Sequence, residues 1–323
     1  MEEVKLNELI KNAEGGNGEA QYELGRYYYD NMEYDNAVKY LQLACENKNI
    51  EAEILLGICS AEGKGIEKDI DKANEIFLKY ANLGYASAQN AIGVSYAKGE
   101  GVKKDVEEAI KWYKKASEQG HFRAQYNLAI KYENGNGVEK NLEEAIKWYK
   151  KAAQQGFDKA QYKLGVCYYY GDGVEQNYEK AVEWYMKSAN QGNSNAQNDL
   201  GYCYGKGYGV EQNMEKEVEW YTKAANQGHS TAQCNLGKCY RYGDGVKQDY
   251  EKAITWLEKS AKQRNESASN ELRALLKSLE TPVGDLDKSD NEHVDKKDKI
   301  KIETLDELFD DVFGKLDKSN KDE

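Results

Sequence analysis

The chain has 323 residues, of which 40% are apolar, enough to build a sizeable core. It carries 45 lysines and arginines against 57 acidic residues, and the net charge of −12 disfavours nucleic acids and anionic lipid surfaces as partners. No stretch approaches the roughly 20 apolar residues of a membrane span, and the N-terminus lacks the apolar run of a signal peptide. The composition predicts a soluble, cytoplasmic protein, not inserted in a membrane, whose partners are other proteins.

In chain order, the first predicted element is an N-terminal capping helix over residues 1–15. From residue 16 to residue 264 the sequence repeats, with a period of 36 residues except for a shorter first copy. Only one proline accompanies 29 glycines, which is typical of a chain that uses one glycine-built turn many times. A period of this length predicts a solenoid of seven repeats. The copies align on one alanine each, at Ala20, Ala52, Ala88, Ala124, Ala160, Ala196 and Ala232.

Each copy has the pattern of two helices joined by a turn. In the first helix a Leu-Gly pair such as Leu164-Gly165 is followed by a tyrosine, Tyr168 in this copy, at which the helix is predicted to end. Glycine inside a helix costs about 1 kcal/mol relative to alanine, so its recurrence predicts close approach of a neighbouring helix. A Gly-x-Gly turn such as Gly171 to Gly173 then precedes a residue placed to cap the second helix. These caps are Asp69, Asp105, Asn141, Asn177, Asn213 and Asp249.

The second helix of the repeat carries all five tryptophans of the chain at one position and ends at a glycine suited to a left-handed cap. Glu217 departs from the pattern, because the other copies have alanine there. We expect looser packing in that repeat or a local salt bridge. The six cysteines form no CxxC pair and are predicted to be reduced thiols. Because neither helix can bury its apolar face alone, the repeats are predicted to stack into an all-α solenoid.

The pattern resembles the Sel-1-like repeat family, a relative of the tetratricopeptide repeats. The resemblance is strong over residues 85–264 and looser over residues 16–84. It implies a right-handed superhelix of helix-turn-helix repeats with a concave groove, and a role as an adaptor that assembles protein complexes. A secreted, cysteine-paired branch of the family has been linked to penicillin binding or β-lactamase activity. The chain lacks that pairing, so a hydrolase is the weaker alternative to a scaffold.

No motif in the sequence predicts catalysis. The Gly-x-Gly turns lie between helices and lack the Gly-Lys-Ser/Thr end of a phosphate-binding loop. Of the three histidines, His121 and His229 occupy the same turn position, and His293 lies in a charged tail. Asp285, Asp287 and Ser289 resemble the start of a calcium loop that lacks the required glycine and glutamate. The sequence therefore predicts no catalytic, cofactor-binding or metal-binding residue, no cofactor, and no enzyme activity.

A protein partner is predicted to bind in the concave groove. At about 100° per residue, the second, sixth and ninth residues after the repeat alanine lie opposite the core face of the first helix. Tyrosine and arginine recur there, and both are enriched in binding hot spots. Packing between adjacent helices is the alternative role for each tyrosine. The predicted groove residues are Tyr126, Tyr162, Val166, Tyr169, Asn198, Tyr202, Lys238 and Arg241.

After a predicted C-terminal capping helix over residues 265–280, the repeat ends. Residues 281–301 are predicted to be a charged flexible linker, residues 302–317 an acidic amphipathic helix, and residues 318–323 a disordered end. The helix has a Thr-x-x-Glu capping box and too few basic residues for a membrane surface. It is predicted to dock on a partner protein as a second element. There are two alternatives. The helix docks on its own solenoid, which would make the chain autoinhibited, or no stable helix forms. Its apolar face comprises Leu305, Leu308, Phe309, Val312, Phe313 and Leu316. The chain is predicted to be a monomer.

Overall fold

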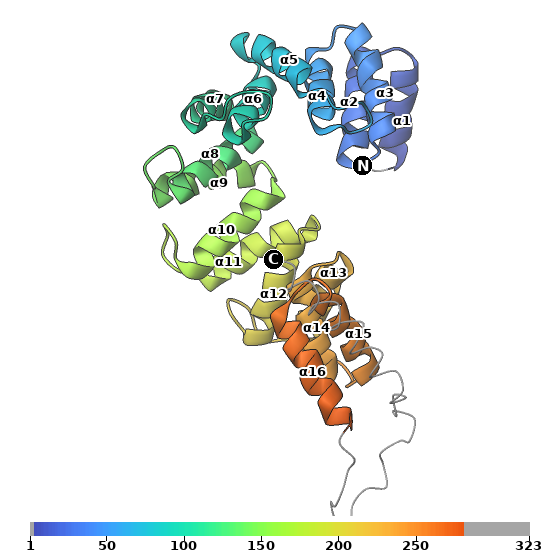
Figure 1. The fold of residues 1–323 in the computed structure, drawn as a ribbon, viewed down its shortest axis with the longest axis vertical. Coiled ribbons are helices and arrows are strands. Elements are labelled where there is room, and N and C mark those ends of the chain that lie inside the picture. The colour runs from blue at the N-terminus through green and yellow to red at the C-terminus, as the bar shows by residue number, and fades with distance from the viewer. Residues whose placement is uncertain (1–2, 281–323) are drawn as a thin grey trace, which may run out of the picture. The chain divides into compact units, whose positions relative to one another are not determined.

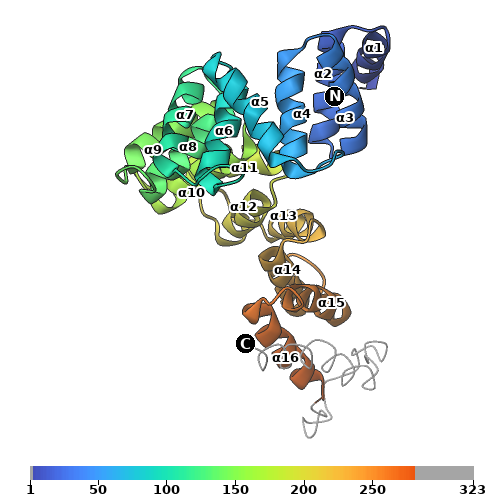
Figure 2. The same cartoon turned by 45° about the horizontal axis from the view of Figure 1, so that its top comes forward.

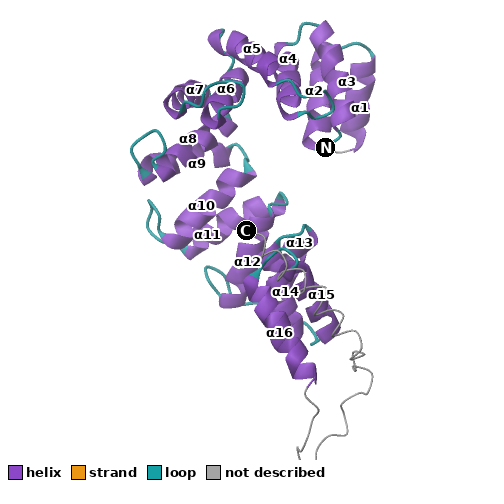
Figure 3. Ribbon diagram, in the orientation of Figure 1, coloured by secondary structure: helices purple, strands orange, loops and turns teal. Residues whose placement is uncertain are grey.

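The computed structural model describes residues 3–280, and in that range it consists of sixteen α-helices and contains no strand (Figure 3). This confirms the predicted all-α class. The chain divides within α10 into two compact units, residues 1–160 and the residues from 161 onward, here called the N-terminal unit and the C-terminal unit. In the N-terminal unit each helix from α1 to α9 packs against the next (Figure 1). In the C-terminal unit α11 to α16 do the same (Figure 2).

The helices alternate between first and second helices of the repeat, after α1. Those up to the division are α1 (Glu3–Glu14), α2 (Gly18–Asp30), α3 (Tyr34–Glu46), α4 (Ile50–Glu62), α5 (Ile70–Asn82), α6 (Ala86–Lys98), α7 (Val106–Glu118), α8 (Phe122–Asn134), α9 (Leu142–Gln154) and α10 (Asp158–Tyr170). The others are α11 (Tyr178–Asn190), α12 (Ser194–Lys206), α13 (Met214–Asn226), α14 (Ser230–Tyr242), α15 (Tyr250–Ala261) and α16 (Glu266–Glu280).

The predicted caps of the second helices are confirmed. In each of the six, the Asp or Asn side chain accepts a hydrogen bond from the backbone N–H three residues later, as Asn213 does from Lys216 at 2.8 Å. The predicted end of the first helix is wrong by two residues, because the helix continues past the tyrosine to the first glycine of the turn. That glycine adopts the left-handed conformation that ends the helix, as Gly207 does at φ +71°.

The two glycines of the turn have different surroundings. The three atoms nearest to a Cβ at the first, Gly207, would be in the Gln212 side chain, the Gln212 backbone nitrogen and the Val210 carbonyl, all at ordinary contact distance. A Cβ at the second, Gly209, would collide with the backbone carbonyl of Tyr178 at the start of the preceding repeat's second helix, and Gly209 itself has φ +69°. The turn is therefore a hinge within one repeat and also a contact between two repeats.

A neighbouring helix lies close to the glycine inside the first helix, as the sequence predicted. A Cβ at Gly165 would collide with the ring of Tyr185, and one at Gly201 would lie 2.8 Å from the ring of Tyr221. The neighbour is the second helix of the same repeat, whose large core side chain contacts the glycine. Tyr185 and Tyr221 are both almost fully buried, which accounts for the recurrence of glycine despite its cost in a helix.

In repeat six Glu217 replaces the usual alanine, and a second unusual residue, Gly205, makes room for its larger side chain. The Glu217 carboxylate lies over Gly205, where a Cβ would collide with it, and accepts a hydrogen bond from the Tyr221 hydroxyl. Burial raises the pKa of Glu217 above its ordinary value. The expected looser packing is therefore not found, because the missing side chain at residue 205 makes room for the carboxylate.

A ladder of buried glutamines joins successive helices, and it explains the Ala-Gln pairs of the sequence. The Nε2 of Gln197 donates to the carbonyl of Ala189 on α11 at 3.1 Å, and its Oε1 accepts from Gln227 after α13 at 2.7 Å. One side chain thus ties three helices together. The same two bonds recur at Gln89, Gln125 and Gln233.

Removal of one glutamine of the ladder should weaken the fold. Gln197→Ala leaves the buried carbonyl of Ala189 and the part-buried amide of Gln227 without their hydrogen bonds, and we expect a loss of about 1–2 kcal/mol in the free energy of unfolding. Urea unfolding followed by circular dichroism measures it. The control is Gln154→Ala, at an exposed glutamine of α9. If both variants lose the same free energy of unfolding, the hydrogen bonds of the ladder add nothing to the effect of the substitution on helix propensity.

Candidate protein-binding site

The N-terminal unit contains a cavity of about 480 Å³ on the side of the first helices. Side chains of α2, α4 and α6 form most of its lining, and the start of α8 completes it. Its floor is apolar and buried, with Ile54 1% and Leu55 9% exposed. The lining residues are Tyr22, Arg26, Tyr29, Asp30, Glu51, Ile54, Leu55, Ile58, Ala86, Ser87, Asn90, His121, Phe122 and Arg123.

Six of these lining residues occupy the repeat positions from which the groove residues were predicted. Counted from the repeat alanine, the second residue supplies Tyr22, Ile54 and Asn90. The sixth supplies Arg26 and Ile58. Tyr29 is a ninth residue. The individual residues were not among those predicted, although alignment of the first three copies on their alanines would have pointed to them.

Two arginines on the rim of the cavity each lie over an aromatic ring. The Arg26 guanidinium carbon is 5.9 Å from the ring centre of Tyr22, and that of Arg123 is 5.5 Å from the ring centre of Phe122. Arg123 also forms a long ion pair, 4.0 Å, with Asp30, which joins repeat four to repeat one. Arginine stacked on an aromatic ring keeps its N–H edge available to a ligand. The rim therefore offers the residue types found in protein-binding hot spots.

His121 lies at the entry of α8 and is held neutral. Its Nδ1 accepts a hydrogen bond from the backbone N–H of Ala124 at 3.2 Å, so it caps the helix. Burial lowers its pKa to about 4, and the nearby charge of Arg123 adds to the effect. His229 caps α14 in the same way. The turn role predicted for both histidines is thus a helix cap, and His121 brings no charge to the cavity near neutral pH.

Tyr126, the predicted groove residue in the N-terminal unit, lies outside the cavity lining. Its half-buried ring is 5.7 Å from the ring of Tyr149 and 5.2 Å, edge on, from that of Phe157. These contacts connect adjacent helices. A role of Tyr126 in binding stays a prediction.

In the C-terminal unit, Tyr169 and Tyr202 belong to a cluster of five tyrosines. The cluster comprises Tyr169, Tyr170, Tyr178, Tyr202 and Tyr208, whose neighbouring ring centres lie 4.9–6.2 Å apart. Tyr170 is 66% and Tyr202 40% exposed, so the cluster reaches the surface. Val166 is half-buried and packs against the core cluster formed by α11 and α12.

Tyr162 and Asn198 meet at Asp199. The Tyr162 hydroxyl donates to Asp199 Oδ2 at 3.1 Å, and the Asn198 amide donates to Oδ1 at 3.0 Å. Burial raises the pKa of Asp199, while the two hydrogen bonds and the charge of His229 oppose the rise. Asn198 is itself buried and accepts from Asn235 at 3.3 Å. Both predicted residues therefore take part in contacts between successive first helices.

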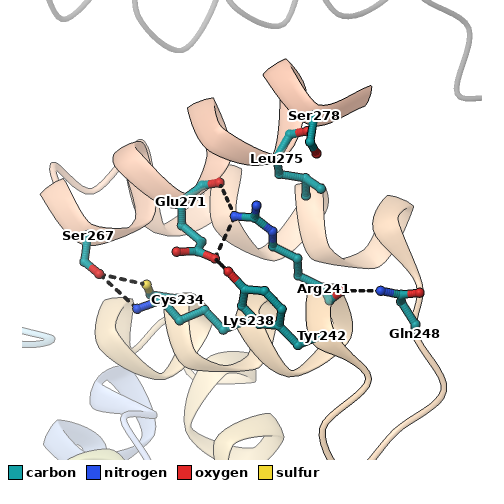
Figure 4. Close-up of polar contacts among 9 residues, drawn as sticks. All are labelled: Cys234, Lys238, Arg241, Tyr242, Gln248, Ser267, Glu271, Leu275 and Ser278. Atoms are coloured by element: carbon teal, nitrogen blue, oxygen red, sulfur yellow. Dashed lines mark hydrogen bonds and ion pairs between the residues drawn. The ribbon is translucent and has the colours of Figure 1, made fainter. Parts of the chain in front are cut away.

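Lys238 and Arg241 contact the closing helix α16 (Figure 4). Arg241 donates to the Glu271 carboxylate at 2.8 Å and to its carbonyl at 3.1 Å, and Lys238 donates to the Ser267 hydroxyl at 3.1 Å. The Arg241 side chain is only 16% exposed. A partner would have to compete with α16 for both side chains, and their role in binding stays a prediction.

The described residues hold no constellation typical of catalysis or metal binding. No group of three or more His, Cys, Asp or Glu side chains in residues 3–280 is placed to hold a metal ion. None of the six cysteines forms a disulfide, and burial raises the pKa of the Cys59 thiol to about 11. No helix between residues 3 and 280 has both the length and the apolar character needed to cross a bilayer. The predicted tail helix lies outside the described residues.

The fold and the repeated two-helix unit define a solenoid of helical hairpins. The Sel1 repeat family model matches seven consecutive copies, residues 18–49, 50–85, 86–121, 122–157, 158–193, 194–229 and 230–265. The chain belongs to the Sel1 repeat family, whose repeats serve as scaffolds for protein interaction. This confirms the family resemblance and the predicted solenoid.

Two solved structures show the likeness. The chain is 35% identical to c5321, a protective antigen of uropathogenic Escherichia coli with this fold, at a TM-score of 0.65. The match covers 84% of the chain and 59% of c5321, so the chain spans little more than half of that protein. A Sel1 repeat protein from Oxalobacter formigenes is also 35% identical, at a TM-score of 0.61, over 74% of this chain and 96% of the other. No curated protein matches the chain.

Proposed function

We propose that the chain is a non-enzymatic scaffold that binds a segment of another protein along the faces of its first helices. The cavity of the N-terminal unit carries the proposal, because six of its lining residues occupy the repeat positions that were predicted to face the groove. We propose further that it acts as a monomer, and that it acts in the cytoplasm, since six cysteines without a disulfide suit a reducing compartment.

The acidic tail is proposed as a second docking element. Its apolar residues, from Leu305 to Leu316, recur at the spacing of one helix face, as in helices that dock in a partner's groove.

A chain ending at Glu280 tests the two elements separately. In a pulldown from lysate of the source cells, we expect the shortened chain to lose some partners and keep others, because the repeats and the tail bind independently. The same partners at greater yield would show that the tail competes for the groove. If neither the full chain nor the shortened chain retains a specific partner, the scaffold function is wrong.

A further inference from the structure

We propose that the cavity of the N-terminal unit binds a large uncharged side chain of an extended peptide, while the rim residues bind the main chain beside it. The inference rests on the proposed scaffold function and names the chemistry of the bound segment.

The floor of the cavity selects an apolar group. The apolar lining that a ligand can reach comprises the half-buried side chains of Ile58, Ala86 and Phe122, and the buried side chains of Ile54 and Leu55 complete it. A volume of about 480 Å³ lies within the roughly 300–1,000 Å³ of ligand pockets. Burial of a large aliphatic or aromatic side chain contributes about 1.5–3 kcal/mol, which makes it the main anchor of a peptide.

The rim selects against a charged ligand, because its charges cancel. Arg26 and Arg123 face Asp30 and Glu51 around the opening, and Arg26 has a further acidic partner in Glu23 at 3.1 Å. A phosphate or an acidic peptide would require an excess of positive charge. A peptide main chain instead presents both acceptors and donors. Its carbonyl oxygens can accept hydrogen bonds from arginine, and its N–H groups can donate hydrogen bonds to carboxylates.

The rim residues are also accessible. The side chains of Arg26, Arg123 and Asp30 are 52%, 46% and 56% exposed, and the apolar lining residues Ile58, Ala86 and Phe122 are only half-buried. The Arg123–Asp30 pair is long and exposed, so its loss costs at most about 1 kcal/mol when a peptide replaces it. The site can therefore admit a segment from solvent without rearrangement of the helices.

Peptide selection on the full chain tests the proposal. A displayed library of random peptides, each of about twelve residues, is selected on the immobilised protein, and enriched sequences are synthesised with a fluorescent label. Affinities are measured by fluorescence anisotropy for the unaltered chain, for Ala86→Trp, which fills the cavity, and for Ser194→Trp. Ser194 occupies the same repeat position in the C-terminal unit, so it is the matched control. Ile58→Trp is a second cavity-filling variant if Ala86→Trp does not fold.

We expect enriched peptides to share one large uncharged residue and to lose at least about tenfold in affinity on Ala86→Trp, but not on Ser194→Trp. Added salt should change their affinity little. Peptides that bind the cavity-filled variant equally well would overturn the cavity assignment and leave the scaffold function standing. Peptides selected for charge, with a steep salt dependence, would overturn the proposed chemistry. If no peptide is enriched, both proposals fail.

Discussion

Gly209→Ala should lower the free energy of unfolding by about 3 kcal/mol. Alanine in the left-handed conformation costs about 1–2 kcal/mol, and the added Cβ would also collide with the carbonyl of Tyr178. That carbonyl belongs to a helix and cannot move without disturbing it, which adds about 1–3 kcal/mol. Urea unfolding, followed by the far-ultraviolet circular dichroism of the helices, measures the change.

Gly228→Ala is the matched control for this substitution. Gly228 has φ +86° in the same repeat, but a Cβ there would have open space around it. We therefore expect Gly228→Ala to lower the free energy of unfolding only by the conformational cost, about 1–2 kcal/mol. Equal losses at the two glycines would show that the contact between repeats at Gly209 is unimportant.

In repeat six the carboxylate that serves the buried tyrosine should work equally well on the first helix as on the second, where Glu217 now supplies it. In repeat four the buried Tyr149 hydroxyl donates to Glu133 at 2.6 Å, and alanine, Ala145, stands at the position of Glu217. Glu133 and Gly205 occupy the same repeat position. The two repeats thus supply an acceptor to the same tyrosine from opposite helices.

The double variant Gly205→Glu, Glu217→Ala should therefore be nearly as stable as the unaltered chain. Gly205→Glu alone places two carboxylates in one half-buried site and should cost about 2 kcal/mol. Glu217→Ala alone leaves the Tyr221 hydroxyl without its acceptor and should cost about 1–2 kcal/mol. A coupling energy of about 3 kcal/mol in the double-mutant cycle is expected from urea unfolding. Simple additivity of the two losses would contradict the exchange.

The sequence was sufficient for the features that depend on residues close together in the repeat. The caps such as Asn213 and the glycines such as Gly165 were predicted because local hydrogen bonding and close approach leave a clear residue preference. The end of the first helix was predicted two residues early. The tyrosine is the last residue held on the core face, but the left-handed glycine after it decides where the helix stops.

The cavity could not be predicted from the sequence, because it depends on how successive repeats turn. Asp30 and Arg123 meet although two whole repeats lie between theirs, and that proximity follows from small rotations between repeats which no single repeat encodes. The sequence shows that the glutamines recur, but it does not show what they bind. The constant position of Gln197 within the repeat does not reveal that its partners belong to two other helices.

The fixed spacing of the glutamine ladder bears on how such a chain can change in length. At Gln89, Gln125 and Gln233 the carbonyl partner lies eight residues earlier and the amide partner thirty residues later. A recombination event that adds or removes one 36-residue block would therefore join each glutamine to equivalent partners. Repeat two is different, because Glu53 stands in place of glutamine and accepts from Tyr80 instead. In-frame duplication therefore preserves the ladder among the later repeats, and a copy of repeat two carries the Glu53–Tyr80 bond with it, because both residues lie within that repeat.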